Sequence, residues 1–262
     1  MSNDFTIYRY SRSMNLGDAV QSIALARLLP GKIGTIDRGG FQENEIGGTL
    51  VINGWLGRNA TVQGRDCLFA GVHLAEPKNL DWFKQSSFPV GSRDPWTQAR
   101  VQEQGLDAQM SLCATLTFEK YTGVRRGVYE VDWSGKGISA PRTRVRVSHW
   151  IAEELPWPDQ WALGLHLLDL YRRAEAVYTD RLHVALPCLA FGTPVFLSAP
   201  QRLEAQPGDY ARRFGTTEAL GIRFDEVNEI DVSAAAAGYR RFLETHLHLS
   251  TVSKPLEHLS HS

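Results

Sequence analysis

The stretch that decides the fold runs from Ala176 to Leu197 and reads AVYTDRLHVALPCLAFGTPVFL. Two short apolar runs with strand character, 176–179 and 194–198, flank a longer run with helical character, 181–191. A strand, a helix and a second strand in immediate succession predict a βαβ unit, whose two strands are parallel.

The same alternation of short apolar runs and longer runs of helical period continues through most of the remaining sequence. The other expected strands are 5–10, 32–36, 49–54, 67–74, 88–92, 107–112, 128–132 and 144–148. The other expected helices are 18–29, 79–86, 95–104, 158–174 and 234–247. This pattern predicts an α/β protein whose sheets are largely parallel.

A polar stretch, 119–127, separates two series of such elements, and we place the domain junction there. The predicted organisation is an N-terminal α/β domain of residues 1–122, a C-terminal α/β domain of residues 123–249 and a flexible tail of residues 250–262. Two successive α/β units imply a cleft between them. Ligands of open parallel sheets bind beyond the carboxyl ends of the strands, so we expect functional residues at strand-to-helix junctions.

The composition excludes several classes of protein. The 262 residues carry a net charge of −1, and their basic residues are spread out, so a nucleic-acid partner is not expected. No apolar run approaches the ~18 residues of an integral membrane segment, and the first residues lack the layout of a secretory signal. Three widely spaced cysteines, Cys67, Cys113 and Cys188, indicate reduced thiols in a cytoplasmic protein.

The first junction with unusual residues contains Asn15, Gly17 and Asp18. Either Asn15 or Asp18 can cap the following helix by accepting hydrogen bonds from free backbone N–H groups. Gly17 permits a tight turn at this position. Alternatively, Gly17 lets a ligand approach the backbone and Asp18 places a carboxylate in the cleft. Both interpretations stay open.

The second junction contains Arg93, Asp94 and Pro95. Asp94 at the N-cap and Pro95 at the first helical position form a strong helix start. They do not account for Arg93, because a cation before a helix N-terminus opposes the positive end of the helix dipole. An anionic ligand removes this conflict, and a nearby carboxylate is the alternative. We favour the ligand.

The third junction, in the stretch quoted first, contains Asp180, Arg181 and His183. Asp180 can cap the helix, while Arg181 and His183 lie beside its unpaired backbone N–H groups. Two cationic side chains at the positive end of a helix indicate an anion, although a histidine bonded to a carbonyl is the structural alternative. Pro187, inside the helical run, should bend the helix or delay its start.

Five segments of the sequence, three of which contain these junctions, point to a known family when they are considered together. They are NLGDAVQSIALARLL (15–29), VINGW (51–55), FAGVHLA (69–75), VGSRDPWTQARVQEQGLDAQMSLCATLTF (90–118) and AVYTDRLHVALPCLAFGTPVF (176–196). Together, and in this order, they resemble the polysaccharide pyruvyltransferase family over roughly residues 8–215. The resemblance implies a fold similar to that of GT-B glycosyltransferases, in which two Rossmann-like domains face a cleft. It also implies an enzyme that transfers the pyruvyl unit of phosphoenolpyruvate to a sugar, forms a pyruvate ketal and releases phosphate.

The resemblance implies roles for the residues of the third junction and for Arg93. Arg181 and Arg93 match donor-site arginines and would bind the carboxylate and phosphate of phosphoenolpyruvate, with Leu182 in the same site. His183 would be the general acid that protonates the methylene carbon of the donor. The helix dipole should depress the pKa of His183, and a bound trianion should reverse this shift.

The opposite domain supplies the remaining expected site residues. Asp18 is the candidate base or acceptor-orienting residue, and Asn15 and Gly17 would shape the loop before it. His73, at the end of strand 67–74, would contact the acceptor or phosphate, with a structural histidine equally open. Trp55 could stack on a sugar face, although core packing is commoner for tryptophan. His149 receives no role.

The expected partners are phosphoenolpyruvate, as a co-substrate, and a sugar of an exopolysaccharide or cell-surface glycan. No metal and no other cofactor are expected. A lipid-linked acceptor would bring the cytoplasmic enzyme to the inner membrane face. Two alternatives stay open: a GT-B-like sugar-nucleotide glycosyltransferase, which would share the cleft and the anion site, and a catalytically inactive relative that only binds glycan or anion.

Overall fold

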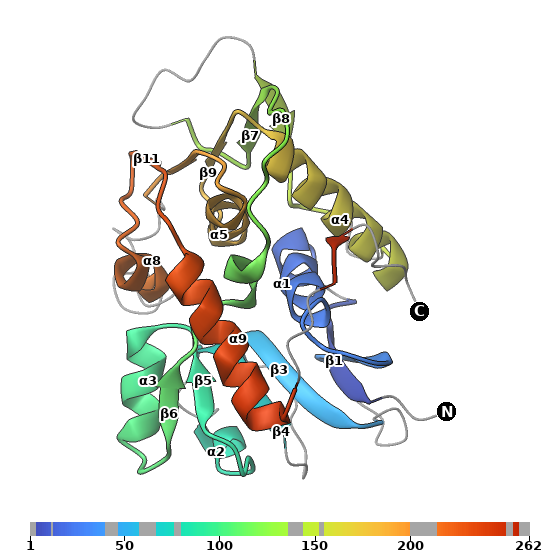
Figure 1. Ribbon diagram of the computed structural model, residues 1–262, viewed down its shortest axis with the longest axis vertical. Coiled ribbons are helices and arrows are strands. Elements are labelled where there is room, and N and C mark those ends of the chain that lie inside the picture. Colours follow the sequence, from blue (N-terminus) through green and yellow to red (C-terminus); the bar gives the residue numbers. More distant parts are fainter. Residues whose placement is uncertain are drawn as a thin grey trace.

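The computed structural model describes residues 4–11, 13–39, 47–57, 67–75, 80–135, 144–151, 155–199, 214–249 and 254–256. It contains two β-sheets, which occupy the lower and the upper half of the molecule in Figure 1. Apart from residues 254–256, the predicted tail of residues 250–262 lies outside the described residues.

The first sheet has six parallel strands in the order β2-β1-β3-β4-β5-β6. The strands are β1 (Phe5–Arg9), β2 (Ile33–Asp37), β3 (Thr49–Leu56), β4 (Cys67–Leu74), β5 (Val90–Ser92) and β6 (Ala108–Met110). The helices between them are α1 (Leu16–Ala26), α2 (Leu80–Phe83) and α3 (Pro95–Gln102). Strand β4 is buried along its whole length, which explains why its sequence is almost continuously apolar.

The second sheet has five strands in the order β11-β10-β9-β7-β8, and only β11 is antiparallel to its neighbour. The strands are β7 (Val128–Val131), β8 (Val145–Val147), β9 (Ala176–Thr179), β10 (Val195–Leu197) and β11 (Val227–Asn228). The accompanying helices are α4 (Trp157–Arg173), α5 (Leu182–Phe191) and α8 (Gly215–Leu220). The predicted α/β class with two Rossmann-like sheets is therefore confirmed.

The two sheets share a topological feature that locates binding sites. In each sheet the first strand along the chain, β1 or β7, lies between the second and the third. The connections therefore leave in opposite directions at β1/β3 and at β7/β9. Such switch points open a crevice at the carboxyl ends of the strands.

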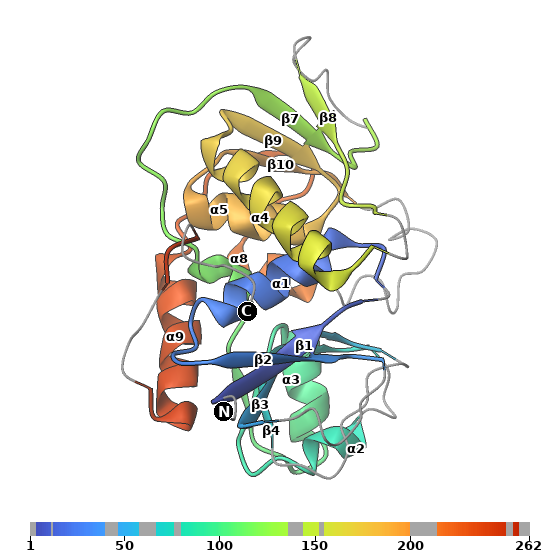
Figure 2. The same cartoon turned by 90° about the vertical axis from the view of Figure 1, so that its right-hand side faces the viewer.

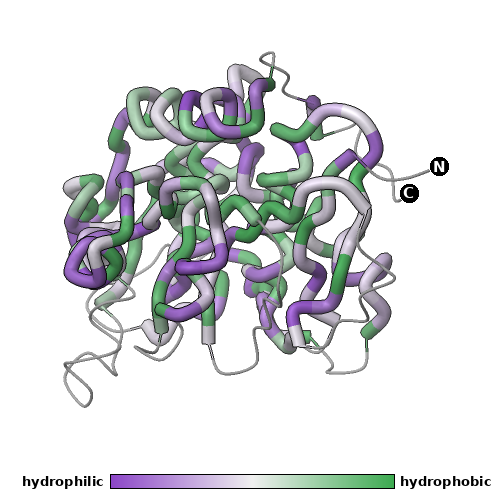
Figure 3. Tube along the Cα trace, turned by 90° about the horizontal axis from the view of Figure 1, so that it is seen from below, coloured by the Kyte–Doolittle hydropathy of each residue, from purple (hydrophilic) through white to green (hydrophobic). Residues whose placement is uncertain are grey.

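Helices fill the space between the sheets and join them in one core. In Figure 2, α4 and α5 lie below the second sheet, and α1 lies between them and the first sheet. A single hydrophobic cluster includes Val51 of β3, Ile23 of α1 and Val177 of β9. Gly164 makes this close packing feasible, since a Cβ there would lie 2.8 Å from Ile23 Cδ1. Figure 3 shows hydrophobic stretches running through the middle of the molecule.

The last long helix, α9 (Ser233–Leu247), packs on the first sheet (Figure 1) and contacts strand β4. It also contacts the 3₁₀ helix η3 (Ala114–Thr117). The Tyr239 hydroxyl donates a hydrogen bond to the Ala70 carbonyl in β4 at 3.0 Å. The division into residues 1–122 and 123–249 stays a prediction, and α9 is the element of the second range that covers the first sheet.

Several predicted elements differ from the observed ones at their ends. Helix α1 begins at Leu16 rather than residue 18, because Asn15 is its cap. The sequence did not predict η3, α8 or β11, which are all short. None of the helices in the described part of the chain combines the length and the apolar character that a membrane crossing demands.

Candidate active site

A cavity of about 250 Å³ lies where the carboxyl ends of strands from both sheets meet. Its lining residues are Asn15, Asp18, Arg38, Trp55, Arg93, His149, Asp180, Arg181, Leu182, His183 and Phe214. Most of them lie at the end of a strand or just after it. A larger cavity of about 650 Å³, between η3, α5 and α9, contains none of the predicted site residues.

The loop before α1 joins the two halves of the molecule at the cavity. The Asn15 side chain accepts a hydrogen bond from Gly17 N at 3.1 Å, so Asn15 is the helix cap. Leu16 N donates to the His149 carbonyl at 2.8 Å, and Asn15 forms an antiparallel bridge with Trp150. The cap of α1 is therefore fixed to the segment that follows β8.

Gly17 lies where α1 approaches His183 of α5. A Cβ at this position would lie 3.2 Å from the Cβ of His183 and 3.1 Å from Asn15 Oδ1. Gly17 does not line the cavity. The close approach of α1 to His183 gives a structural reason for glycine at this position, and a contact between its backbone and a ligand stays a prediction.

Asp18 lies in the first turn of α1 and lines the cavity, as predicted. One of its carboxylate oxygens accepts a hydrogen bond from Ser13 Oγ at 2.6 Å. The buried Tyr10 phenol lies nearby, and its pKa is raised by burial and then by the charge of Asp18. Asp18 therefore offers a carboxylate to the cavity from the first sheet.

Arg93 and His183 form the centre of the cavity. Arg93 directly follows β5, only 3% of it is exposed, and its Nη1 lies 3.3 Å from His183 Nε2. Its Nε has no hydrogen-bond partner and its guanidinium has no ion pair among the residues that the structure describes. Because a guanidinium only donates, Nε2 of His183 must accept, which requires an unprotonated nitrogen.

The pKa of His183 is well below its usual value. Burial is the main cause, followed by the charges of Arg93 and His149. The direction matches the sequence-based prediction, although that prediction attributed it to the helix dipole. Without a ligand the imidazole is therefore neutral at physiological pH.

The backbone at His183 is not helical, although the residue lies within α5. Its φ is −82° and its ψ is 15°. Pro187 lies four residues later, where its ring clashes with the carbonyl of residue 183 and its missing N–H removes that hydrogen bond. The effect of Pro187 on the preceding turn therefore explains why the backbone at His183 departs from helical geometry.

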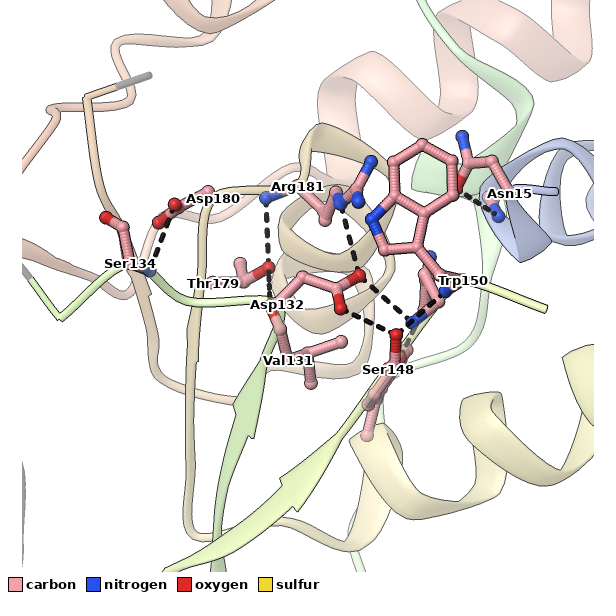
Figure 4. Close-up of polar contacts among 12 residues, drawn as sticks. Asn15, Val131, Asp132, Ser134, Ser148, Trp150, Thr179, Asp180 and Arg181 are labelled. Atoms are coloured by element: carbon pink, nitrogen blue, oxygen red, sulfur yellow. Dashed lines mark hydrogen bonds and ion pairs between the residues drawn. The ribbon is translucent and has the colours of Figure 1, made fainter. Parts of the chain in front are cut away.

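Arg181 is the N-cap residue of α5 and is partly neutralised (Figure 4). Its Nε lies 3.2 Å from Asp132 Oδ2, and its guanidinium lies 4.4 Å from the ring centroid of Trp150. Asp132 also accepts hydrogen bonds from Ser148 Oγ at 2.7 Å and from His149 N at 3.0 Å. The carboxylate partner that was the alternative for Arg93 is therefore absent for Arg93 among the described residues, whereas Arg181 has one.

Asp132 was not predicted as a site residue. It directly follows β7, at the second switch point, so the rule of strand ends would have indicated it. The predicted strand 128–132 instead includes it as its last residue. Asp180 also differs from prediction, because it accepts a hydrogen bond from Ser134 N at 3.0 Å and does not cap α5.

His149 is a second cavity histidine, to which the sequence analysis gave no role. It is fully buried, and its Nε2 lies 2.6 Å from the Tyr171 hydroxyl. Burial lowers its pKa to about 3, with Asp132 opposing and Arg181 adding to the shift. Its Nδ1 has no hydrogen-bond partner within the described ranges.

His73 lies behind the cavity rather than in its lining. It is buried, and its Nδ1 lies 2.7 Å from Asp94 Oδ2. Burial alone would raise the pKa of Asp94, but the hydrogen bond with His73 lowers it. Asp94 caps α3 by accepting a hydrogen bond from Thr97 N at 2.8 Å, so this geometry favours the structural alternative for His73.

Two further residues considered in the sequence also line the cavity. Leu182 lines the cavity beside Arg181, and Trp55 lines it from β3. No group of three His, Cys, Asp or Glu side chains suited to a metal ion occurs among the residues described here.

Comparison with known proteins gives one family. The sequence profile described as polysaccharide pyruvyl transferase matches residues 15–201 of this chain. A comparison with curated protein sequences finds no significant match.

Two solved structures are similar at low sequence identity. An uncharacterised protein from Klebsiella pneumoniae subsp. pneumoniae NTUH-K2044 is 13% identical, with a TM-score of 0.44 over 80% of this chain and 88% of that one. The UDP-GlcNAc 2-epimerase of Methanocaldococcus jannaschii, in complex with UDP-GlcNAc and UDP, is 10% identical. Its TM-score is 0.42, over 94% of this chain and 99% of that one.

Proposed function

This chain belongs to the polysaccharide pyruvyl transferase family, and we propose that it transfers the pyruvyl unit of phosphoenolpyruvate to a sugar as a ketal. The acceptor would be part of an exopolysaccharide or a cell-surface glycan, and phosphate would be released. The observation that carries the proposal is the buried guanidinium of Arg93, which contacts a neutral histidine in a cavity between the two sheets.

The cavity suits a small molecule with several negative charges. Arg93 is buried without an ion pair in the described part of the chain, which is unfavourable unless an anion binds. Arg181 contacts Asp132 through Nε, and its terminal amino groups can take a carboxylate or phosphate bidentately. The donor would thus contact both halves of the protein, with Arg93 on the first sheet and Arg181 on the second.

We assign the first chemical step to His183. The negative charge of the bound donor raises the pKa of the imidazole, which then becomes protonated. His183 gives this proton to the methylene carbon of phosphoenolpyruvate, and C2 becomes electrophilic. The methylene group is now a methyl group, and the imidazole is neutral again.

The acceptor completes the reaction in two attacks on C2. One sugar hydroxyl bonds to C2 and loses its proton to a base, for which Asp18 is the candidate across the cavity. A second hydroxyl then displaces the phosphate from C2 and closes the ketal. Of the two hydroxyl protons, one replaces the proton that His183 gave away and the other leaves on hydrogen phosphate.

The experiment is an incubation of the full chain with phosphoenolpyruvate and methyl galactosides, glucosides and mannosides. We expect one acceptor to gain a pyruvyl ketal, detected by mass, together with an equal amount of phosphate. Thermal stabilisation by a sugar nucleotide but not by phosphoenolpyruvate would favour a glycosyltransferase instead. Donor binding without any product would favour an inactive relative.

We also propose a cytoplasmic location, which phosphoenolpyruvate as donor requires. A lipid-linked acceptor would be met at the inner membrane face. Fractionation of cells that express the tagged chain would test this, with the protein expected in the cytosolic fraction or loosely bound to the membrane.

A further inference from the structure

Arg38 is a cation of the cavity that the sequence analysis did not single out. It directly follows β2, and its backbone N–H donates to the Arg9 carbonyl at 3.0 Å. Its side chain lines the same cavity as Arg93 and His183, and it is only partly exposed. It therefore reaches the site from the strand next to β1.

Two aromatic rings and one carbonyl hold the Arg38 guanidinium in place. It lies 4.8 Å from the ring centroid of Tyr10 and 5.5 Å from that of Trp55. Its Nη1 donates to the Trp55 carbonyl at 3.3 Å. These contacts orient the group and leave most of its five N–H donors for another partner.

No carboxylate neutralises Arg38 within the ranges that the structure describes. The adjacent Asp37 is directed elsewhere, since its Oδ2 lies 4.0 Å from Arg9 Nε and its Oδ1 accepts a hydrogen bond from Gly39 N at 3.0 Å. A partly buried guanidinium without an acidic partner is a ready site for an anion.

The charges of the cavity give Arg38 a specific purpose. Among the described residues, the cavity lining carries the guanidiniums of Arg38, Arg93 and Arg181 and the carboxylates of Asp18 and Asp180. Asp132, outside the lining, pairs with Arg181. Without Arg38 the guanidiniums would no longer outnumber the carboxylates of the lining, and a donor trianion would meet a site with no excess of positive charge.

Arg38 and Arg93 both line the cavity. Both guanidiniums act on the Tyr10 phenol, where their charges lower a pKa that burial raises. We propose that Arg38 and Arg93 together bind the anionic groups of the donor, so that Arg38 is a further substrate-binding residue. This inference rests on the proposed function, because it takes phosphoenolpyruvate as the donor.

The test compares Arg38→Gln and Arg38→Lys with wild type in calorimetric binding of phosphoenolpyruvate and in steady-state kinetics. Arg38→Gln removes the charge but can still donate to the Trp55 carbonyl. We expect it to weaken donor binding at least about tenfold and to raise the donor KM equally. Arg38→Lys should recover part of the loss, and the acceptor KM should stay within about twofold of wild type.

Arg100→Gln is the matched control, because Arg100 is an exposed arginine of α3 paired with Glu103. It should leave both KM values unchanged. Wild-type donor affinity in Arg38→Gln, or a loss confined to the acceptor KM, would overturn the inference and leave the proposed function intact. A wild-type protein that does not bind phosphoenolpyruvate would instead refute the proposed function.

Discussion

The pair of Arg93 and His183 determines what the cavity can do. A buried guanidinium whose Nε has no partner among the described residues, next to a neutral imidazole, is an unfavourable arrangement unless an anion binds. A bound trianion would improve it twice, by pairing with Arg93 and by raising the pKa of His183 so that the imidazole takes up a proton from solvent. Binding of the donor and creation of the acid would thus be one event.

His183→Gln tests this coupling, because glutamine keeps an acceptor for Arg93 but cannot carry the proton. We expect kcat to fall by about 10² to 10⁴, measured as phosphate release. Wild type should also take up protons when phosphoenolpyruvate binds at pH 7, measured by calorimetry in buffers of different ionisation enthalpy. His183→Gln should lose this uptake.

The control for His183→Gln is its melting temperature, which should stay near that of wild type. Unchanged turnover in a folded variant would refute the acid role. Proton uptake that persists in the variant would assign the protonation to another group.

His149 makes a separate prediction about stability and pH. Its pKa is about 3 in the folded protein, far below the usual value of about 6.5, because it is buried. The unfolded chain therefore binds more protons between these values, so stability falls as the pH drops below about 6.5. Between pH 7 and pH 5 we expect His149 to lower the free energy of unfolding by an amount on the order of 2 kcal/mol.

Urea unfolding at pH 7 and pH 5 measures the effect, with His149→Gln as the comparison. The variant should have a lower free energy of unfolding than wild type at pH 7. Between pH 7 and pH 5, however, its free energy of unfolding should fall less than that of wild type. Equal losses in both proteins would contradict a buried neutral His149.

Sequence reasoning located the residues at strand ends whose positive charge conflicts with the dipole of the following helix. Arg93 and Arg181 are examples, since each places a cation before a helix, and the structure brings both to one cavity. It missed His149 and Arg38, whose surroundings depend on distant partners: Tyr171 for His149, and Trp55 for Arg38. The catalytic roles themselves remain predictions.

At the scale of the element, α5 combines an irregular start with a regular, buried end. The distortion at His183 lies four residues before Pro187. Pro187 was recognised in the sequence as an element that bends or delays the helix. Only the structure shows that the backbone angles change at His183.

Pro187→Ala separates the stability of α5 from its function. Alanine would restore the missing backbone N–H and allow a regular first turn. We expect an equal or higher melting temperature but a kcat at least about tenfold lower, because His183 would project differently. Lower stability with full activity would show that the distortion does not depend on Pro187.

The elements that the sequence predicted well are those with strong local patterns. Strand β4 was predicted with its observed ends because every residue of it is buried and its sequence is almost continuously apolar. Strand β11 has only two residues and is defined by its pairing with β10, so no local sequence pattern predicts it. Helix α9 was predicted as a helix, but its packing on β4 depends on a tertiary contact of Tyr239.

At the scale of the whole molecule, the two sheets are not independent. One hydrophobic cluster runs from β3 through α1 and α5 to β10, and α9 returns to cover the first sheet. The cavity between the sheets therefore has walls that are fixed to one another. Such a design suits a site whose arginines come from different sheets and must stay at set distances.

The shared core predicts that the protein unfolds in one cooperative transition. Calorimetry should give one peak, and its temperature should coincide with the loss of tryptophan fluorescence and of circular dichroism. Tyr239→Phe removes the hydrogen bond to the Ala70 carbonyl. This change should lower the free energy of unfolding by about 1–3 kcal/mol. Because the core is common, the whole transition should shift to lower temperature. Two separate transitions, of which Tyr239→Phe moves only one, would show instead that each sheet folds on its own.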